Sequence, residues 1–550
     1  MKRLLRVLGC MFLAACFAWL LLPRCELYPE GTTWSRVMLD REGAVMHLTL
    51  ASDGRYRLKT PLAEIHADVI DATLTHEDRW FRWHPGVNPV SLVRGLLGLV
   101  GGQRLGGGST VTMQLARLRF GLHTRSLWGK CVQVFRALQL ERHYSKNEIL
   151  EAYLNLAPYG GNVEGVGAAS ILWCGKQAGE LSLREAVTLS VLPQSPARRR
   201  PRANADNKHL AAAQVRLIRE LQQEREVRSD PLDTDFTLRA PEQPPREAPH
   251  LARRLLKDHE RAQTTIDANQ QRIVERSMAD YISRKREVGI ENACALLVHA
   301  PSREVLVYAG SARFLSDDIQ GQVDGVTARR SPGSALKPFI YALALDQGLI
   351  HPRSLVSDMK ASFGSYNPEN FDRGFAGPIT AADALFRSRN IPAVTLAQQL
   401  TLDRLYSFLK NAGVAFPKPA SHYGLALPLG GAEVSMEELA SLYVMLANGG
   451  SQFPVRSSQL VYTKAENREP GTENREQLLS PEACHLVREM LRQPDVELGA
   501  DDPAVSWKTG TSHGFRDAWA AGIRGEYVLV VWIGNFSGKP NPAFVARECA

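Results

Sequence analysis

The sequence has few of the residues that stabilise proteins through metals or disulfides. Its 550 residues contain eight cysteines, which form neither a Cys-x-x-Cys pair nor a cluster with histidine. This scatter argues against a structural zinc site and against a dense disulfide framework. We therefore expect no structural metal, and we expect buried free thiols at Cys131, Cys174 and Cys294.

The sequence also lacks internal repeats and long low-complexity tracts. It has no basic blocks interleaved with aromatic residues, so nucleic acid is not an expected partner. The net charge of +8, from 66 basic and 58 acidic residues, is small for this length and suits anionic lipid or phosphate. With 44% apolar and 23% charged residues, the composition is that of a folded protein. The length predicts two or three domains.

Long apolar runs are absent after the N-terminus. The run from Val7 to Leu22 follows a basic tip and approaches the roughly 20 residues that cross a bilayer. Positive charge before the run keeps the N-terminus in the cytoplasm, so later residues are exported. We predict a single-pass anchor at residues 1–26. A cleaved signal peptide and a lipoprotein signal ending at Cys16 are the alternatives.

Two patterns of hydrophobic spacing divide the remaining chain. Helical spacing dominates first, and we place a mainly α domain at residues 45–205. A charged linker is predicted at residues 206–263; the arginines at 198–200 just before it are expected to form a solvated surface rather than a lipid-phosphate contact. Residues 264–550 show strands, then helices, then strands, which predicts an antiparallel sheet covered by helices.

A serine and a lysine three residues apart suggest a nucleophile with its base. Ser334 and Lys337 would share one face of a helix, and a lysine near cations and apolar walls can lose its proton. This spacing alone is weak evidence, because it occurs by chance in many surface helices.

Two further motifs follow in order. Ser388-Arg389-Asn390 supplies a hydroxyl and an amide, and Lys508-Thr509-Gly510-Thr511 follows an apolar strand. A lysine and hydroxyls at a strand edge can hold a carboxylate, and we expect Gly510 to leave room for a peptide alongside. The three motifs in this order are typical of penicillin-binding proteins and related lactamases.

The helical region contains a second set of chemical residues. Glu77 and Asp78 precede several aromatic residues, which suggests a base beside a sugar-binding surface, although acidic residues at a helix start would explain the pair equally well. Further on, Gly106-Gly107-Gly108 precedes a helix whose N-terminus would favour phosphate.

Residues from about 265 onward resemble the transpeptidase domain of penicillin-binding proteins. The resemblance implies peptides ending in D-Ala-D-Ala as substrates, β-lactams as mimics, and no cofactor. Ser334 would be the acylated nucleophile and Lys337 its base. The N–H groups of Ser334 and Thr511 would form the oxyanion hole. Donor positioning and proton relay would fall to Ser388 and Asn390, and carboxylate binding to Lys508, Thr509, Gly510 and Thr511.

Residues 70–196 are similar to the glycosyltransferase domain of class A penicillin-binding proteins, including Ser145 to Asn155. This implies a lysozyme-like helical fold that joins lipid II units, with undecaprenyl pyrophosphate as leaving group. A divalent cation, Mg²⁺ or Mn²⁺, is an option for this domain. Glu77 would be the general base. The residues expected to bind or orient pyrophosphate and sugar are Asp78, His84, Ser109, Thr110, Gln114, Arg117 and Lys130.

One departure from the family pattern affects this second site. Gln133 occupies a position where many members carry Glu, which puts a second carboxylate and metal coordination there in doubt. We expect Gln133→Glu to be tolerated. This substitution, Thr112-Met113-Gln114 and residues 508–519 resemble the 1C type of the family.

The predicted fold is therefore multidomain: a transmembrane helix, a mainly α lysozyme-like glycosyltransferase domain, and an α/β transpeptidase domain of the β-lactamase-like class. The resemblance implies peptidoglycan synthesis at the bacterial inner membrane, with periplasmic domains, nascent peptidoglycan as a partner and a cell-wall synthesis complex as an option. The alternative is a glycosyltransferase whose second domain hydrolyses peptide or binds β-lactam. A non-catalytic scaffold is disfavoured by the intact motifs.

The chain stops soon after the apolar stretch Tyr527 to Ile533, where the resembled families carry a terminal helix. We expect the transpeptidase domain to lack that helix and to be less stable than the glycosyltransferase domain.

Overall fold

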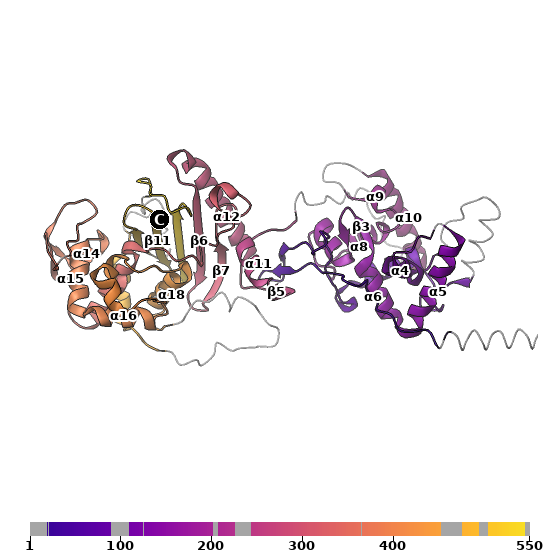
Figure 1. The fold of residues 1–550 in the computed structure, drawn as a ribbon, viewed down its shortest axis with the longest axis horizontal. Helices are drawn as coiled ribbons and strands as arrows, with labels where there is room; N and C mark the ends of the chain where they lie inside the picture. The colour runs from indigo at the N-terminus through magenta and orange to yellow at the C-terminus, as the bar shows by residue number, and fades with distance from the viewer. Residues whose placement is uncertain are drawn as a thin grey trace, which may run out of the picture. The chain divides into compact units, whose positions relative to one another are not determined.

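The chain folds into two compact units, each described separately. The structure, a computed structural model, describes Trp19 and residues 21–89, 109–124, 126–201, 207–225, 244–364, 366–452, 476–493 and 504–544. The first, the helical unit, comprises residues 1–38 and 47–246, and the second, the sheet unit, comprises residues 39–46 and 247–550 (Figure 1).

Most of the predicted anchor at residues 1–26 lies outside the described residues. Within the part of the chain that the structure does describe, no helix has the length and apolarity needed to cross a membrane.

The helical unit is built around the buried helix α8 (Leu183–Val191), which packs against α2 (Ala67–Glu77). α6 (Lys146–Leu156) packs against α4 (Val111–Phe120). α6 and α8 each start with a capping box, which satisfies the first free N–H groups and fixes where the helix begins. The other elements of this unit are η1 (Leu62–Glu64), α5 (Leu127–His143), β3 (Pro158–Gly160), β4 (Val163–Glu164), α7 (Val166–Ala169), η2 (Ser170–Cys174), α9 (Pro196–Arg199) and α10 (Lys208–Arg225).

The predicted linker, residues 206–263, is divided differently in the structure. α10 buries Leu210, Leu217 and Leu221 and packs on α8 and α2, so it belongs to the helical unit. α11 (Pro249–Leu255) and β5 (Arg261–Gln263) belong to the sheet unit. An amphipathic helix lowers its free energy by burying its apolar face, which charge content alone does not reveal.

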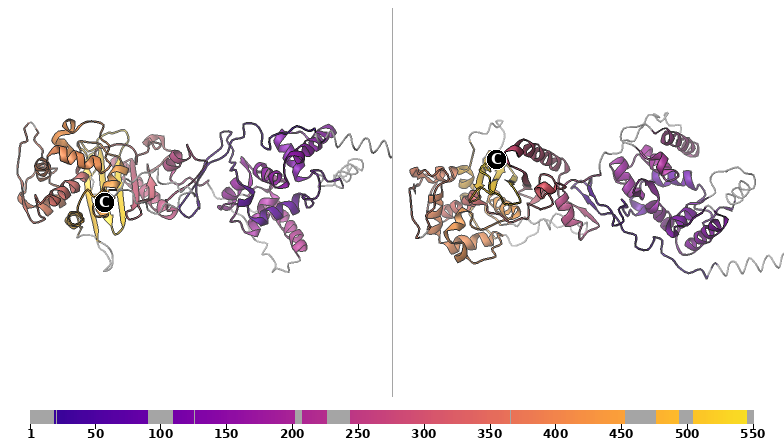
Figure 2. Two further views of the ribbon diagram at one scale, coloured as in Figure 1. Left: turned by 90° about the horizontal axis from the view of Figure 1, so that it is seen from below. Right: turned by 45° about the horizontal axis from the view of Figure 1, so that its top comes forward.

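The sheet unit is organised by a five-stranded antiparallel sheet with strand order β10-β11-β12-β6-β7. α12 (Ala268–Lys285) packs on β6 and β7, while α18 (Met436–Ala447) packs on β11, β12 and β6, and Figures 1 and 2 show helices on both sides of the sheet. The strands are β6 (Asn292–His299), β7 (Glu304–Ala309), β10 (Val505–Thr511), β11 (Asp517–Arg524) and β12 (Tyr527–Gly534).

Helices and short strands complete this unit. β8 (Leu355–Asp358) and β9 (Gly377–Thr380) form an antiparallel pair. β1 (Val37–Leu39) and β2 (Val45–Leu48), each divided between the two units, form a three-stranded sheet with β5 in the order β2-β1-β5. The remaining elements are η3 (Arg286–Val288), η4 (Asp317–Ile319), η5 (Gly333–Leu336), α13 (Lys337–Asp346), α14 (Ala381–Phe386), α15 (Asn390–Leu400), α16 (Leu402–Asn411), α17 (Ala420–Tyr423), η6 (Gly424–Leu429) and α19 (Pro481–Met490).

The predicted succession of a mainly helical domain and an antiparallel sheet with helices is confirmed. Of the three thiols expected to be buried, Cys294 is buried, Cys174 is half-buried and Cys131 is exposed. On the outer side of β12, Tyr527 and Leu529 are 44% and 40% exposed. The lower stability expected for this domain stays a prediction.

Candidate active sites

Ser334 lies in the short 3₁₀ turn η5, directly before α13. Among the described residues its hydroxyl has no hydrogen-bond partner, so it is available to a substrate. The neighbouring Ser331 hydroxyl instead donates to the carbonyl oxygen of Gly430 at 2.7 Å. The structure therefore separates the predicted nucleophile from the nearby serine by hydrogen bonding.

The serine turn lies directly against the edge strand β10. Gly333 has φ of +52°, and a Cβ atom there would overlap the backbone of Thr511. A Cβ atom on Gly510 would overlap the carbonyl oxygen of Pro332. The lack of a side chain at Gly510 therefore makes room for the serine turn, and a peptide alongside the strand stays a prediction. The contact brings together the two backbone segments expected to form the oxyanion hole.

Lys337 joins the first motif to the second. Its side-chain nitrogen donates to the backbone oxygen of Ser388 at 2.6 Å, to that of Arg389 at 3.1 Å and to Oδ1 of Asn390 at 2.6 Å. The Ser388 hydroxyl is 3.5 Å away. The contact expected between Lys337 and Ser334 is not among the hydrogen bonds of the described residues. Lys337 instead anchors the Ser388–Asn390 turn, in which Ser388 has a φ of +58°.

Electrostatics favour proton loss from Lys337. The side chain is completely buried, and burial is the main cause that lowers its pKa well below the usual range. The positive charges of Lys508 and Arg389 lower it further, while Asp358 opposes them. A buried lysine beside two other cations has the character required of a general base.

Along β10, the side chains of Lys508 and its neighbours alternate between the two faces of the strand. Lys508 is buried, its nitrogen donates to the backbone oxygen of Thr509 at 2.9 Å, and burial lowers its pKa to about 7. Thr509 and Thr511 are half-buried on the opposite face of the strand. Because β10 is the edge of the sheet, one side of its backbone has no neighbouring strand in that sheet.

In the helical unit, Glu77 lies at the end of α2. Its Oε2 accepts a hydrogen bond of 2.7 Å from Nε2 of Gln114, whereas its Oε1 is buried without a partner. Burial is the main cause that raises the pKa of Glu77, and Gln114, Arg199 and Arg117 oppose this shift. A carboxylate with a raised pKa and one free oxygen suits a general base.

Asp78 and His84 form a buried pair, in which Nε2 of His84 lies 3.0 Å from both carboxylate oxygens. Asp78 also accepts from the backbone N–H of Val111 at the start of α4. Thr110 is the N-cap of α4, and its hydroxyl donates to the oxygen of Gly86 at 2.6 Å. These three predicted ligand residues thus fix the start of α4 in the structure.

The expected anion-binding residues Lys130 and Ser109 lie together, with a distance of 2.7 Å between Nζ and Oγ. Lys130 also donates to Oε1 of Gln133 at 2.9 Å, and Gln133 donates to the oxygen of Met113 at 2.6 Å. Gln133 thus takes part in positioning Lys130 without neutralising its charge. Arg117 is exposed, so its charge is accessible to a ligand.

One relevant residue was missed from the sequence. Arg199 belongs to the arginine run expected to form a solvated surface, yet it is half-buried and donates to the oxygen of Val191 at 2.6 Å. Its charge lowers the pKa of the neighbouring Glu77. The sequence carried no signal for this proximity, because it depends on the packing of α8, α9 and α2.

The divalent cation considered for the helical unit stays a prediction, and two of the candidate donors there are already engaged. Asp78 is occupied by His84 and Val111, and position 133 carries an amide whose oxygen and nitrogen are both used. Within the described ranges there is no group of three His, Cys, Asp or Glu side chains suited to a metal. We derive no step through a metal ion.

The structure thus combines a buried carboxylate in the helical unit with a serine and a buried lysine beside an edge strand in the sheet unit. Residues 43–222 match the transglycosylase family, and residues 293–545 match the penicillin binding protein transpeptidase domain. The chain is 38% identical to penicillin-binding protein 1C of Escherichia coli K12, over 98% of this chain and 70% of that protein.

The chain belongs to the class A penicillin-binding proteins, the bifunctional enzymes of peptidoglycan synthesis, as the sequence motifs predicted. It is also 27% identical to penicillin-binding protein 1F of Bacillus subtilis 168, over 86% of this chain and 70% of that one. Penicillin-binding protein 1A of Haemophilus influenzae, a solved structure, is 17% identical with a TM-score of 0.49, covering 92% of this chain and 88% of that one.

Proposed function

We propose that the sheet unit cross-links stem peptides through an acyl-enzyme on Ser334. The observation that carries this is the convergence of three distant motifs: Lys337 hydrogen-bonds to Ser388 and Asn390, and the serine turn packs on the Lys508–Thr511 strand. In the acylation step Ser334 Oγ attacks the penultimate D-Ala carbonyl, its proton passes to Lys337, and the terminal D-Ala leaves with a proton. An acceptor amine then displaces the serine.

The helical unit is proposed to polymerise lipid II. Glu77 would take the proton from the acceptor sugar hydroxyl as that oxygen bonds to the donor sugar and the pyrophosphate leaves. Lys130, Ser109 and Arg117 would hold the departing anion, while Gln114 orients Glu77. Asp78, His84 and Thr110 would act by fixing the start of α4.

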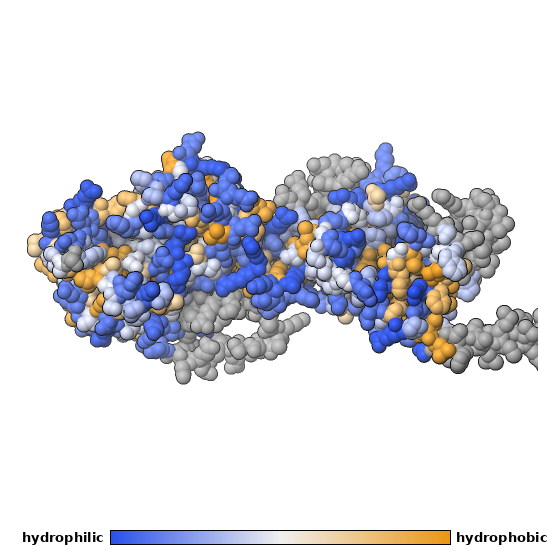
Figure 3. All heavy atoms as spheres, in the orientation of Figure 1, coloured by the Kyte–Doolittle hydropathy of each residue, from blue (hydrophilic) through white to orange (hydrophobic). Residues whose placement is uncertain are grey.

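A lipid-linked substrate and a membrane-proximal position fit the surface of this unit. The exposed aromatic residues Trp80, Trp83, Trp128 and Phe135 are from 49% to 83% exposed. Figure 3 shows apolar surface on the part of the helical unit where α5 and α6 lie. Exposed apolar surface of this kind marks interaction sites. We propose a single-pass inner-membrane anchor with exported catalytic units; partners within a cell-wall synthesis complex stay a prediction.

Two assays on the full chain test the proposal. Fluorescent penicillin should label the wild type but not Ser334→Ala. Polymer formation from lipid II should be lost in Glu77→Gln, which should still be labelled by penicillin. Analysis of the peptide products distinguishes cross-linking from hydrolysis, because an amine and water compete for the same acyl-enzyme. A labelled Ser334→Ala, or a fully active Glu77→Gln, would contradict the assigned roles.

A further inference from the structure

The Ser388–Asn390 turn, which receives the hydrogen bonds of Lys337, has an unusual backbone conformation. Ser388 has a φ of +58°, in the left-handed region that few residues other than glycine adopt. In this conformation the backbone oxygens of Ser388 and Arg389 both accept from the Lys337 nitrogen, at 2.6 and 3.1 Å. A residue that is not glycine stays in this region only where its surroundings fix it. Contacts outside the turn must therefore hold it.

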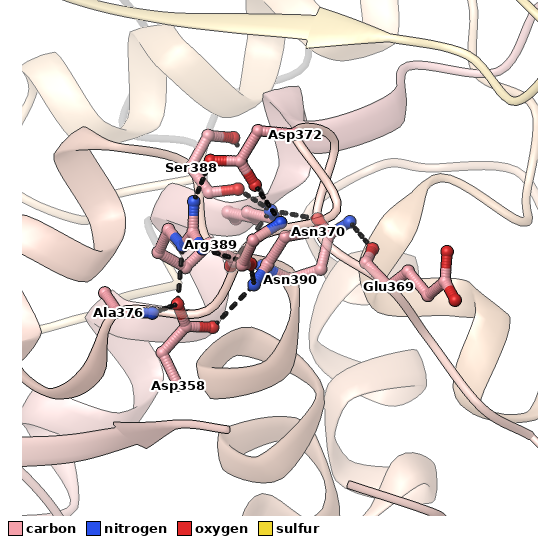
Figure 4. A network of polar contacts seen from close by, with 10 residues as sticks. Asp358, Glu369, Asn370, Asp372, Ala376, Ser388, Arg389 and Asn390 are labelled. Carbon is pink, nitrogen blue, oxygen red and sulfur yellow. Dashed lines mark hydrogen bonds and ion pairs between the residues drawn. The ribbon is translucent and has the colours of Figure 1, made fainter. Parts of the chain in front are cut away.

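The side chain of Arg389, the central residue of the turn, supplies such contacts (Figure 4). The residue is 9% exposed, and each of its three guanidinium nitrogens donates to a different acceptor. Nε donates to Asp358 at 2.6 Å, Nη1 to Asp372 at 2.8 Å and Nη2 to the backbone oxygen of Gly374 at 2.6 Å. Charge-assisted hydrogen bonds are about twice as strong as neutral ones, so the guanidinium is held firmly from three sides.

Asp358 closes a ring of hydrogen bonds that returns to the turn. It is fully buried, and besides Arg389 it accepts from the side-chain nitrogen of Asn370 at 2.8 Å. The Oδ1 atom of Asn370 accepts from the backbone N–H of Asn390 at 2.7 Å. The side-chain nitrogen of Asn390 donates to the backbone oxygen of Glu369 at 2.6 Å, which leaves its Oδ1 for the buried lysine. The ring therefore fixes both the backbone and the amide of the motif.

The same ion pair lies close enough to Lys337 to act on its charge. Burial is the main cause that lowers the pKa of Lys337. The positive charges of Lys508 and Arg389 lower this pKa further, whereas the Asp358 carboxylate raises it. The two members of the ion pair thus act on the lysine in opposite directions, which an ion pair remote from the site would not do.

We propose that Arg389 is a positioning residue for acylation, and that its ion pair with Asp358 holds the turn in the conformation that orients Lys337. In this scheme Arg389 acts through the three acceptors that receive the hydrogens of the lysine. Without the ion pair, the left-handed residue relaxes and the lysine loses its two backbone acceptors. The inference rests on the proposed acylation of Ser334.

The test measures the second-order rate of acylation by benzylpenicillin against pH, on the full chain. In Arg389→Gln the maximal rate should fall about 10- to 100-fold, because a displaced base loses its alignment. The acidic limb, which reports proton loss from Lys337, should move to higher pH, because a positive charge that lowers its pKa is removed.

Two further variants separate charge from geometry. In Asp358→Asn the acidic limb should move to lower pH, because the charge that raises the pKa of Lys337 is removed. Arg389→Lys keeps the positive charge but replaces the planar fork of donors by a compact ammonium. Its acidic limb should stay at the wild-type position, while its maximal rate should remain below that of the wild type.

Arg387→Gln is the matched control, because it removes a positive charge from an exposed arginine two positions earlier. Its rate and its acidic limb should be those of the wild type. A wild-type rate in Arg389→Gln would overturn the proposal. So would a loss of rate with an unmoved limb in both Arg389→Gln and Asp358→Asn, since that result describes a merely structural ion pair.

Thermal unfolding shows whether each variant is folded. If Arg389→Gln does not fold, the other two variants decide. A wild-type rate in Arg389→Lys, or an unmoved limb in Asp358→Asn, would then overturn the proposal. A wild type that benzylpenicillin does not acylate at any pH would refute the proposed function itself, and the role of Arg389 with it.

Discussion

The side-chain nitrogen of Lys337 donates to the backbone oxygen of Ser388 at 2.6 Å, although the two residues are 51 positions apart. Together with the oxygens of Arg389 and Asn390, this contact accounts for all three hydrogens of an ammonium group. To act as a base toward Ser334, Lys337 must give up a proton or one of these contacts. Its burial beside Lys508 and Arg389 favours the first, because it lowers the pKa of Lys337.

This arrangement predicts that Lys337→Met abolishes acylation without unfolding the protein. Removing a general base should lower the acylation rate by roughly 10²- to 10⁴-fold. Replacing Lys337 by Met leaves three buried acceptors without their donor, so the free energy of unfolding should fall by roughly 1 to 3 kcal/mol. Stopped-flow acylation and thermal unfolding, measured on the same preparation, check both parts. A variant that acylates at the wild-type rate would show that Lys337 is not the base.

The site of the covalent adduct is predicted by the hydrogen bonds of the two neighbouring serines. Ser331→Ala should retain β-lactam labelling, with a cost of about 1 kcal/mol in stability from its lost bond to Gly430. Ser334→Ala should lose the label. Mass spectrometry of digested, penicillin-treated protein locates the adduct, and an adduct on Ser331 or Ser388 would contradict the assignment.

Arg199 should set the acidic limb of the polymerisation pH profile. Its charge lowers the pKa of Glu77, so Arg199→Gln should raise that pKa. The base form of Glu77 would then require a higher pH, and the limb should move to higher pH. Arg198→Gln is the control, because Arg198 is an exposed neighbour in the same run. A shift of equal size in both variants would indicate a general charge effect rather than proximity to Glu77.

Lys508 should produce a basic limb in the pH profile of acylation. Burial lowers its pKa to about 7, and only the ammonium form attracts the β-lactam carboxylate. The second-order acylation rate should therefore decrease as pH rises through about 7, where Lys508 loses its charge. A penicillin methyl ester, which lacks the carboxylate, should not show this limb. A limb of equal size with the ester would assign it to another group.

Gln133→Glu should change stability little, as expected from the sequence. The new carboxylate would attract Lys130 but would face the backbone oxygen of Met113, to which the amide now donates. Each effect changes the free energy of unfolding by about 1 kcal/mol, and the two changes have opposite signs. A thermal shift assay and a polymerisation assay check this. A large gain in polymerisation would mean that the amide limits catalysis at this position.

The sequence determined the chemistry of this protein and its order along the chain. Ser334, Lys337, Lys508 and Glu77 could be predicted as site residues because their residue types, spacing and local patterns are properties of contiguous segments. The helical domain and the antiparallel sheet were predictable for the same reason, since periodicity and motif order are local. The position of α10 was not, because its charged surface resembles a linker until its leucines are seen packed on α8 and α2.

Only the tertiary structure decided which groups meet. It placed Lys337 on Ser388 and Asn390, filled the space beside Gly510 with the serine turn, and brought Arg199 close to Glu77. It also joined Arg389 to Asp358 and Asp372. These contacts link distant segments, and their strength depends on burial and on distances of a few ångströms. Both quantities arise from packing, which residue type and spacing do not specify.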